Sequence, residues 1–429
     1  MLKQDLFTSL DTLVGKQAGN NPLALAFSGG GDSTALLALA LQWLGGQRKL
    51  YALIVDHGLR VGSAAEAQQA AKTAQRLGAH PIILTWQGTK PKTGIQEKAR
   101  LARYGLMGTQ CRTLGVDTLL LGHNRNDQAE TVYMRGQNNS GWRGMAGMRA
   151  AIKAPIWPEL YGITIVRPML GISRAKLRDY NHANDLTYYD DPSNENRQFS
   201  RIQARDFLQK HPRLGEELYA ISQNAARDLR EETAQIRAWI GIYVQTQNWG
   251  GLSLKRDVIA GSNGLGPEML RKLGLAVSGQ GQASARNKYR QLFAKINAND
   301  FQGATLGGAQ YSIWKNELFI MRDPGQVLGR VGHKGLAHTK LRAGIDTIWD
   351  GRFIVRTMRE NMHIVPLANY EGQLDKALKQ KLKLLPVSAR ATLPALVRGD
   401  VLKSSPLHKP SSQYEFQSLI TERLLILSE

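Results

Sequence analysis

Short apolar runs alternate with longer helical patterns in the first third of the chain. Residues 23–27 form an apolar run of strand length, and 34–44 repeats apolar positions with helical spacing until Gly45-Gly46 ends it. The alternation continues with strands at 50–55, 81–84 and 116–122 and helices at 64–77, 95–114 and 127–135. Because strands that are apolar at every position are buried on both faces, the pattern predicts an α/β domain with a doubly wound parallel sheet.

The pattern changes beyond about residue 205. Residues 216–239 are long, charged and helical, and helical spacing returns at 267–273 and 284–296. Residues 304–321 instead predict a hairpin, with turn signals at 307–308 and 315–316 between aromatic and β-branched runs. From residue 346 onward, short strand-like pieces surround one helix. We therefore expect a helical middle domain and a smaller α+β C-terminal domain.

The composition adds a strong charge asymmetry. The 429 residues include 56 Lys and Arg against 35 Asp and Glu, a net charge of +21. This excess indicates a polyanionic partner, nucleic acid or an acidic membrane surface, although a solvated basic surface is the alternative. No apolar run approaches the roughly 20 residues of a membrane span, and charges interrupt the first 17 residues, which predict an amphipathic helix. Cys111 is the only cysteine, which excludes an intrachain disulfide and cysteine-based metal sites and favours a cytoplasmic protein.

A glycine-rich loop joins the first predicted strand to the helix that follows. Its residues are Ser28, Gly29, Gly30, Gly31, Asp32 and Ser33. Glycines let backbone N–H groups approach a ligand, and the positive end of the following helix favours an anion. The loop lacks the lysine of a Walker sequence, and Thr34 replaces the third glycine of a dinucleotide fingerprint. Since an acid beside phosphate needs a cation, Asp32 indicates a Mg²⁺ ion that bridges to a nucleotide.

Residues 28–33 resemble the pyrophosphate loop of the N-type ATP pyrophosphatases, which split ATP between its α and β phosphates. Within that group, "VDHGLR" at 55–60 is similar to a stretch beside the nucleotide in tRNA(Ile)-lysidine synthetases. The resemblance implies that ATP is bound by the glycine loop together with Asp56, His57, Arg60 and His123. Read alone, the short 55–60 stretch could be an ordinary strand end.

A longer match begins at His123. It resembles the family motif His-x-x-Asp-Asp-Gln-x-Glu-Thr followed by spaced glycines, here through Asp127, Gln128, Glu130 and Thr131 and then Gly141, Gly144, Gly147 and Met148. Asn126 replaces the first Asp, and Asn138-Asn139 stand where Arg-Gly is usual. Asp127 and Glu130 share a helix face, where two carboxylates could hold an ammonium, bind a metal or take protons. The alternative is a helix start enriched in acids.

A fourth match runs from residue 166 to residue 205. It resembles the family order of Arg-Pro, a helix, Asp-Pro-Ser-Asn and spaced arginines, and it assigns substrate or tRNA binding to Arg167, Arg174, Asn194, Arg201 and Arg205. Ile202 departs from a position that is usually Asn. The four matches keep one order over residues 28–205. The chain length is similar to the long form of the family, which implies domains at 1–210, 211–325 and 326–429, the last two binding tRNA.

The resemblance implies one reaction. ATP, free L-lysine and an isoleucine tRNA with a CAU anticodon would give lysidine at the wobble cytidine, with release of AMP and pyrophosphate. Asp32, Asp127 and Glu130 are the expected catalytic residues, with ATP and Mg²⁺ as cofactors. A free lysine amine has a pKa near 10.4, so Asp127 and Glu130 are candidates to bind the ammonium and then accept its proton. Lys376, Lys379 and Lys383 could contact tRNA phosphates or form a solvated helix face.

Three other interpretations stay open at this stage. A tRNA thiolase of the same ATP class would normally need more cysteines than Cys111. A glutamine-dependent synthetase would need an amidotransferase domain, and no cysteine nucleophile follows Met1. A non-catalytic RNA-binding protein with a relic nucleotide fold would have no need of Asp32, Asp127 and Glu130. The sequence leaves open whether the protein is a monomer or a homodimer.

Overall fold

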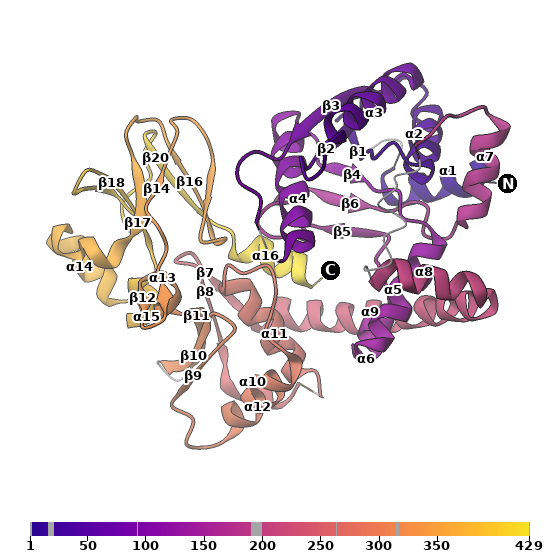
Figure 1. Ribbon diagram of the computed structural model, residues 1–429. Coiled ribbons are helices and arrows are strands. Elements are labelled where there is room, and N and C mark those ends of the chain that lie inside the picture. Colours follow the sequence, from indigo (N-terminus) through magenta and orange to yellow (C-terminus); the bar gives the residue numbers. More distant parts are fainter. Residues whose placement is uncertain are drawn as a thin grey trace. The chain divides into compact units, whose positions relative to one another are not determined.

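The computed structural model describes residues 2–15, 21–91, 93–189, 200–262, 264–314 and 317–428 (Figure 1). Contacts divide the chain into two compact units, Met1–Glu231 and Glu232–Glu429. Each unit is described by itself. The predicted boundaries at 210 and 325 stay a prediction, and Asn194 lies outside the described residues. Within these residues no helix is long and apolar enough to cross a membrane.

The first unit is built on a six-stranded sheet with the order β3-β2-β1-β4-β6-β5. Strand β1 pairs in parallel with β2 and β4, whereas β5 is an antiparallel edge strand on β6. The predicted doubly wound parallel sheet is therefore confirmed, with an antiparallel edge added. The strands are β1 Leu23–Ala26, β2 Leu50–Asp56, β3 His80–Thr85, β4 Thr118–Leu120, β5 Ala151–Lys153 and β6 Thr164–Val166.

Helices cover both faces of this sheet (Figure 1). On one face, α1 (Leu2–Leu13), α2 (Gly31–Leu44), α3 (Ser63–Leu77) and α7 (Arg174–Ala183) pack in one apolar core with β1 and β2. On the other face, α4 (Ile95–Thr113) contributes Tyr104, Met107 and Cys111 to a second core. Cys111 is fully buried, and burial raises the pKa of its thiol to about 12. A thiol in this state is a packing residue and not a reactive sulfur.

Four further helices belong wholly or in part to the first unit. Two of them come between β4 and β5 in the sequence, and two follow α7. They are α5 (Arg125–Gln137), α6 (Gly141–Met145), α8 (Ser200–Lys210) and α9 (Pro212–Tyr243). A small core of Ala129 and Val132 from α5 with Leu208 and Leu218 joins α5 to α8 and α9. Because this core sets which side of α8 faces α5, it also sets the positions of Arg201 and Arg205 on α8.

The second unit begins with an antiparallel sheet in the order β7-β8-β11-β10-β9. The predicted hairpin at 304–321 is confirmed, since Leu306 pairs with Ala309 and Trp314 with Glu317. Helices α10 (Arg256–Ala260), α11 (Gly266–Val277) and α12 (Arg286–Asn297) accompany this sheet. Its strands are β7 Gln245–Gln247, β8 Gly251–Lys255, β9 Gly303–Leu306, β10 Ala309–Trp314 and β11 Glu317–Arg322.

The C-terminal part contains two further antiparallel sheets, β14-β17-β18-β19 and β15-β16-β20, around a core of its own. Its last helix packs instead in the core of the preceding sheet, through Ile420 and Leu424. The elements are α13 Pro324–Val327, β12 Gly329–Arg330, β13 His333–Lys334, β14 Thr339–Lys340, β15 Thr347–Trp349, β16 Phe353–Thr357, β17 His363–Pro366, the 3₁₀ helix η2 Leu367–Gln373, α14 Lys376–Lys383, α15 Val387–Ala391, β18 Pro394–Arg398, β19 Val401–Ser404, β20 Tyr414–Ser418 and α16 Ile420–Leu427.

Candidate active site

The glycine loop connects β1 to α2 through a sharp backbone turn. Gly29 has φ +78°, a left-handed conformation that favours glycine, and Gly30 caps α2 with extended backbone. The Ser33 hydroxyl donates to the Gly30 carbonyl oxygen at 2.9 Å and lies 3.1 Å from the Ser28 hydroxyl. The first N–H groups of α2 have no partner within the helix, so the turn presents donors and the positive end of a helix together. This is the geometry of an anion site.

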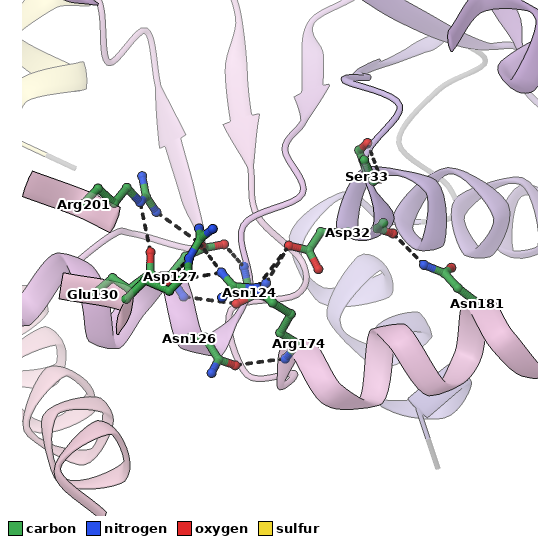
Figure 2. A network of polar contacts seen from close by, with 12 residues as sticks. Asp32, Ser33, Asn124, Asn126, Asp127, Glu130, Arg174, Asn181 and Arg201 are labelled. Atoms are coloured by element: carbon green, nitrogen blue, oxygen red, sulfur yellow. Dashed lines mark hydrogen bonds and ion pairs between the residues drawn. The ribbon is translucent and has the colours of Figure 1, made fainter. Parts of the chain in front are cut away.

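Asp32 stands in the first turn of α2, with its side chain 29% exposed. Its Oδ2 atom accepts a hydrogen bond from Asn124 Nδ2 at 2.9 Å and lies 3.6 Å from Arg174 Nε (Figure 2). Burial raises the pKa of this carboxyl, Arg174 opposes the rise, and Asp127 adds to it. Both contacts are made by Oδ2, so the Asp32 carboxylate is held through this one oxygen atom.

Asn124 is a central residue of the site that sequence reasoning missed. It is fully buried and caps α5, accepting the Asp127 N–H at 3.1 Å while its own N–H donates to Asp127 Oδ2 at 2.9 Å. This reciprocal capping box leaves its amide free to donate to Asp32. One side chain therefore ties the glycine-loop acid to the start of α5. A polar residue three positions before an acid, a few residues after a strand, was the available signal.

Asp127 and Glu130 lie side by side on α5 and share two arginines. Arg174 Nη2 lies 3.0 Å from Asp127 Oδ1 and 3.3 Å from Glu130 Oε1. Arg201 contacts the same two carboxylates at 3.2 and 3.1 Å (Figure 2). Arg205 Nε lies 3.0 Å from Glu130 Oε1. The predicted pair of acids is thus brought together with three predicted arginines in one network, and Glu130 is only 2% exposed.

The departures from the family motif have defined places in this structure. Asn126 Oδ1 accepts the backbone N–H of Arg174 at 2.9 Å, so a neutral amide holds the start of α7. Asn138 caps the end of α5, and Asn139 has φ +49°. Gln128 then holds the glycine-spaced loop, because its Oε1 accepts the Met148 N–H at 2.8 Å.

The remaining predicted ATP residues lie at the carboxyl ends of β2 and β4. Asp56 Oδ1 accepts the Gly58 N–H at 2.9 Å, and Arg60 forms an ion pair with Glu66 at 2.6 Å. Burial, helped by Arg103, lowers the pKa of His57 to about 4. Burial, helped by Arg167, lowers the pKa of His123 to about 3. Both imidazoles are therefore neutral at physiological pH.

Helix α7 and the chain after it support the glycine loop from outside. The Asn181 amide donates to the Gly31 carbonyl oxygen at 2.9 Å, and the Tyr189 N–H donates to the Gly29 carbonyl oxygen at 2.9 Å. A Cβ at Gly31 would lie 3.3 Å from the ring of Tyr188, closer than ordinary van der Waals contact, so a larger residue there would require the ring to shift. These contacts were not predicted, because they join residues that are 150 or more positions apart and have no common motif.

The predicted RNA contacts of the second unit lie on one helix. Lys376, Lys379 and Lys383 are exposed on α14, whose first turn is capped by the Asp375 side chain. Lys379 also donates to the Gly372 carbonyl oxygen at 3.0 Å. Lysines on the solvent side of a short helix are available for phosphate contacts.

The fold and the loop define the class of protein. Residues 2–211 match the model of the PP-loop domain family, which agrees with the parallel sheet and the glycine turn after β1. The PP-loop identifies an ATP-using protein.

Relatives over most of the chain define the family within that class. The tRNA(Ile)-lysidine synthase of Caulobacter vibrioides is 32% identical over 89% of this chain and 86% of its own length. That of Hyphomonas neptunium is 34% identical over 71% of this chain and 83% of its own length. That of Rhodopseudomonas palustris is 31% identical over 70% of this chain and 90% of its own length. The chain belongs to the tRNA(Ile)-lysidine synthase family, and it is an enzyme of that kind, a ligase that uses ATP.

Proposed function

We propose that this enzyme joins lysine to C2 of the wobble cytidine in an isoleucine tRNA with a CAU anticodon. ATP would first adenylate the C2 oxygen, releasing pyrophosphate, and the ε-amine of free L-lysine would then displace AMP. The observation that carries the proposal is the continuous network from the glycine loop through Asp32 and Asn124 to Asp127 and Glu130. This continuity supports the proposal, because the residues proposed for ATP activation lie next to the residues proposed to receive a cation.

In the first step the loop would bind the departing pyrophosphate through the N–H groups at the start of α2 and the hydroxyls of Ser28 and Ser33. Asp32 fits a Mg²⁺ ligand because Oδ2 is anchored by Asn124 and Oδ1 is the oxygen left for a metal. When bound, Mg²⁺ neutralises phosphate charge and stabilises the leaving group. In the described residues no group of three or more His, Cys, Asp or Glu side chains could hold a metal. This fits an ion held by one carboxylate together with phosphates and water.

In the second step Asp127 and Glu130 would receive the lysine ammonium. Their oxygens contact three guanidinium groups, and the side chain of Arg201 is the most exposed of the three arginines, at 41%. We propose that Arg201 occupies the position of the incoming cation and yields it to lysine. The carboxylates would then accept the proton that the amine must lose before it can attack.

Arginines of this network would also face the RNA. When Arg201 leaves the carboxylates, it is free to pair with a phosphate, and Arg167, Arg174, Arg205 and Asn194 are proposed as further substrate contacts. The lysines of α14 would add phosphate contacts elsewhere on the tRNA. Affinity for tRNA should then fall steeply with salt. An affinity that stays flat between about 50 and 200 mM salt would contradict this part of the proposal.

The deciding experiment combines ATP, labelled L-lysine and unmodified tRNA transcripts with the protein. We expect lysine incorporation into the isoleucine transcript with a CAU anticodon, with one AMP formed per lysine. A methionine transcript, which has the same anticodon, is the matched control and should stay unlabelled. ATP turnover without lysine transfer would favour another modification of the same class, and no turnover at all would contradict catalysis.

A further inference from the structure

Two histidine–arginine pairs lie at the carboxyl edge of the first sheet. Arg103 of α4 places Nε and Nη2 at 3.3 and 3.2 Å from His57 Nε2. Arg167, directly after β6, donates from Nε to His123 Nδ1 at 3.2 Å. His57 follows β2 and His123 follows the end of β4, so the pairs stand on either side of β1. Only Arg103 is new to the site, since it belongs to none of the sequence motifs described above.

The contacts assign the proton on each imidazole. A guanidinium can only donate, so His57 Nε2 and His123 Nδ1 are acceptors. The protons then lie on His57 Nδ1 and His123 Nε2, and both rings are neutral because their pKa values are about 4 and 3. His57 Nδ1 is buried and has no hydrogen-bond partner among the described residues. A buried donor without an acceptor indicates a group that is supplied from outside.

The guanidinium groups of Arg103 and Arg167 have only neutral acceptors among the described residues. Within 4.0 Å, neither Arg103 nor Arg167 has a carboxylate partner in the part of the chain that the structure describes. The second guanidinium contact of Arg167 is the carbonyl oxygen of Arg149 at 2.9 Å. Arg174 is different, because it contacts three carboxylates. Guanidinium groups held only by neutral acceptors keep their full attraction for an anion.

The position of the two pairs points to the kind of anion. Strands β2 and β4 are separated only by β1, so their ends are about 10 Å apart, within reach of arginine side chains from both sides. Ligands of such sheets bind outside the carboxyl ends of the strands, and β1 leads directly into the glycine loop. The planar fork of arginine matches the oxygens of a phosphate group.

We propose that Arg103 and Arg167 form a phosphate-binding site in front of β1. This site deepens the proposed function and rests on it, because the phosphate belongs either to the nucleotide or to the RNA strand that presents the cytidine. The histidines act as positioning residues that hold the guanidinium groups without neutralising them. The glycine loop would bind pyrophosphate separately.

The test measures equilibrium binding of ATP and of the isoleucine transcript to Arg103→Ala, both without lysine. Arg103 is exposed, so the fold should tolerate the change. We expect affinity for one ligand to fall at least about tenfold, the size of a lost charged hydrogen bond. Loss for ATP assigns the nucleotide phosphate, and loss for the transcript assigns the RNA phosphate. Arg103→Lys should recover part of the loss, because it restores the charge without the fork.

Lys98→Ala is the matched control, because it removes one exposed positive charge from the same helix. It should leave both affinities within twofold of the native values. The same result for Arg103→Ala would overturn the site. Since no ligation is measured, a failure of lysine transfer would not be mistaken for a failure of this site.

A double variant tests whether the two arginines hold one ligand. If they bind the same phosphate, Arg103→Ala and Arg167→Lys should lose less affinity together than the product of their separate losses. Strictly multiplicative losses would mean two unrelated contacts and would overturn a shared site. Thermal unfolding of each variant separates this result from a loss of the fold.

Discussion

Two networks of arginines and carboxylates serve different purposes in the two units. In the first unit, Asp127 and Glu130 meet Arg174, Arg201 and Arg205, and two of these arginines keep 28% and 41% of their side chains exposed. In the second unit, Asp350 meets Arg322 and Arg352, and all three side chains are at most 6% exposed. The first network can exchange a cation with solvent, and the second cannot.

The partners of each network explain the difference. Arg322 and Arg352 direct their other donors to the carbonyl oxygens of Gly308 and Thr392 at 3.0 and 2.6 Å. The donors of these arginines are thus shared between one acid and the backbone, which fixes the strands around them. The first network lies instead at the carboxyl edge of a parallel sheet, where such folds bind ligands. Similar ion pairs are therefore buried within the fold in one unit, and in the other they lie where we propose the ligand site.

The largest effect is expected from Asp32→Ala. Loss of the proposed metal ligand should reduce AMP formation by at least about a hundredfold, the scale of removing one preorganised electrostatic contact. Affinity for tRNA should stay within about threefold, because the change lies outside the proposed RNA contacts. A radiolabel assay for AMP and a filter-binding assay for tRNA measure the two effects. Asp5→Ala, an exposed acid of α1, is the control. Persistent AMP formation would remove Asp32 from the chemistry.

A large loss of stability, with no direct effect on chemistry, is expected from Asp350→Ala. It leaves buried guanidinium groups without their acid, which should lower the free energy of unfolding by about 3–5 kcal/mol. Asp346→Ala is the matched control, since that acid forms an exposed pair with Arg356 at 2.6 Å, and exposed pairs contribute little to stability. Urea unfolding measures both. Equal losses would contradict the contrast between the networks.

Glu130→Gln should separate the two chemical steps. If Glu130 receives the lysine ammonium, KM for lysine should rise at least about tenfold, whereas AMP formation changes less. Steady-state kinetics over a range of lysine concentrations provides the measurement. Glu97→Gln, an exposed acid of α4, should change neither constant. An unchanged KM for lysine would restrict Glu130 to holding the arginines.

The sequence predicted the sheet, the glycine turn and the charged residues, but not the amides between them. Periodicity located most strands and helices, because burial of one face repeats along the chain. Asp32, Asp127 and Arg174 were selected because each is a charged residue in a motif that can be recognised from the sequence alone. Asn124 and Asn181 were missed, because their importance comes from contacts over 92 and 150 positions. Charge patterns also could not tell which arginines the acids would bind.

Asn124→Asp tests one of these missed amides. It replaces the donor to Asp32 with a carboxylate, so that two negative groups face each other at a distance of 2.9 Å in the native pair. We expect AMP formation to fall about tenfold and to recover partly at high Mg²⁺ concentration. A titration of activity with Mg²⁺ measures this recovery. Asn224→Asp makes the same change on the exposed face of α9 and should have no effect. An unchanged Mg²⁺ requirement would separate Asn124 from Asp32.

The smallest expected effect is that of the Asp32 charge on the stability of the folded protein. Its pKa is raised above 3.8, mainly by burial, so the folded protein disfavours the charged carboxylate at neutral pH. A folded state that binds the proton more tightly loses stability as pH rises through this range. Asp32→Asn should therefore unfold at a temperature about 1–2 °C higher at pH 7, although it is inactive. The gap should narrow as the pH falls from 7 toward 4, because native Asp32 takes up its proton in this direction. Scanning calorimetry at both pH values measures it. A lower unfolding temperature of Asp32→Asn at pH 7 would mean that Arg174 stabilises the charged form of Asp32 in the folded protein. The two networks would then differ only in how exposed their side chains are.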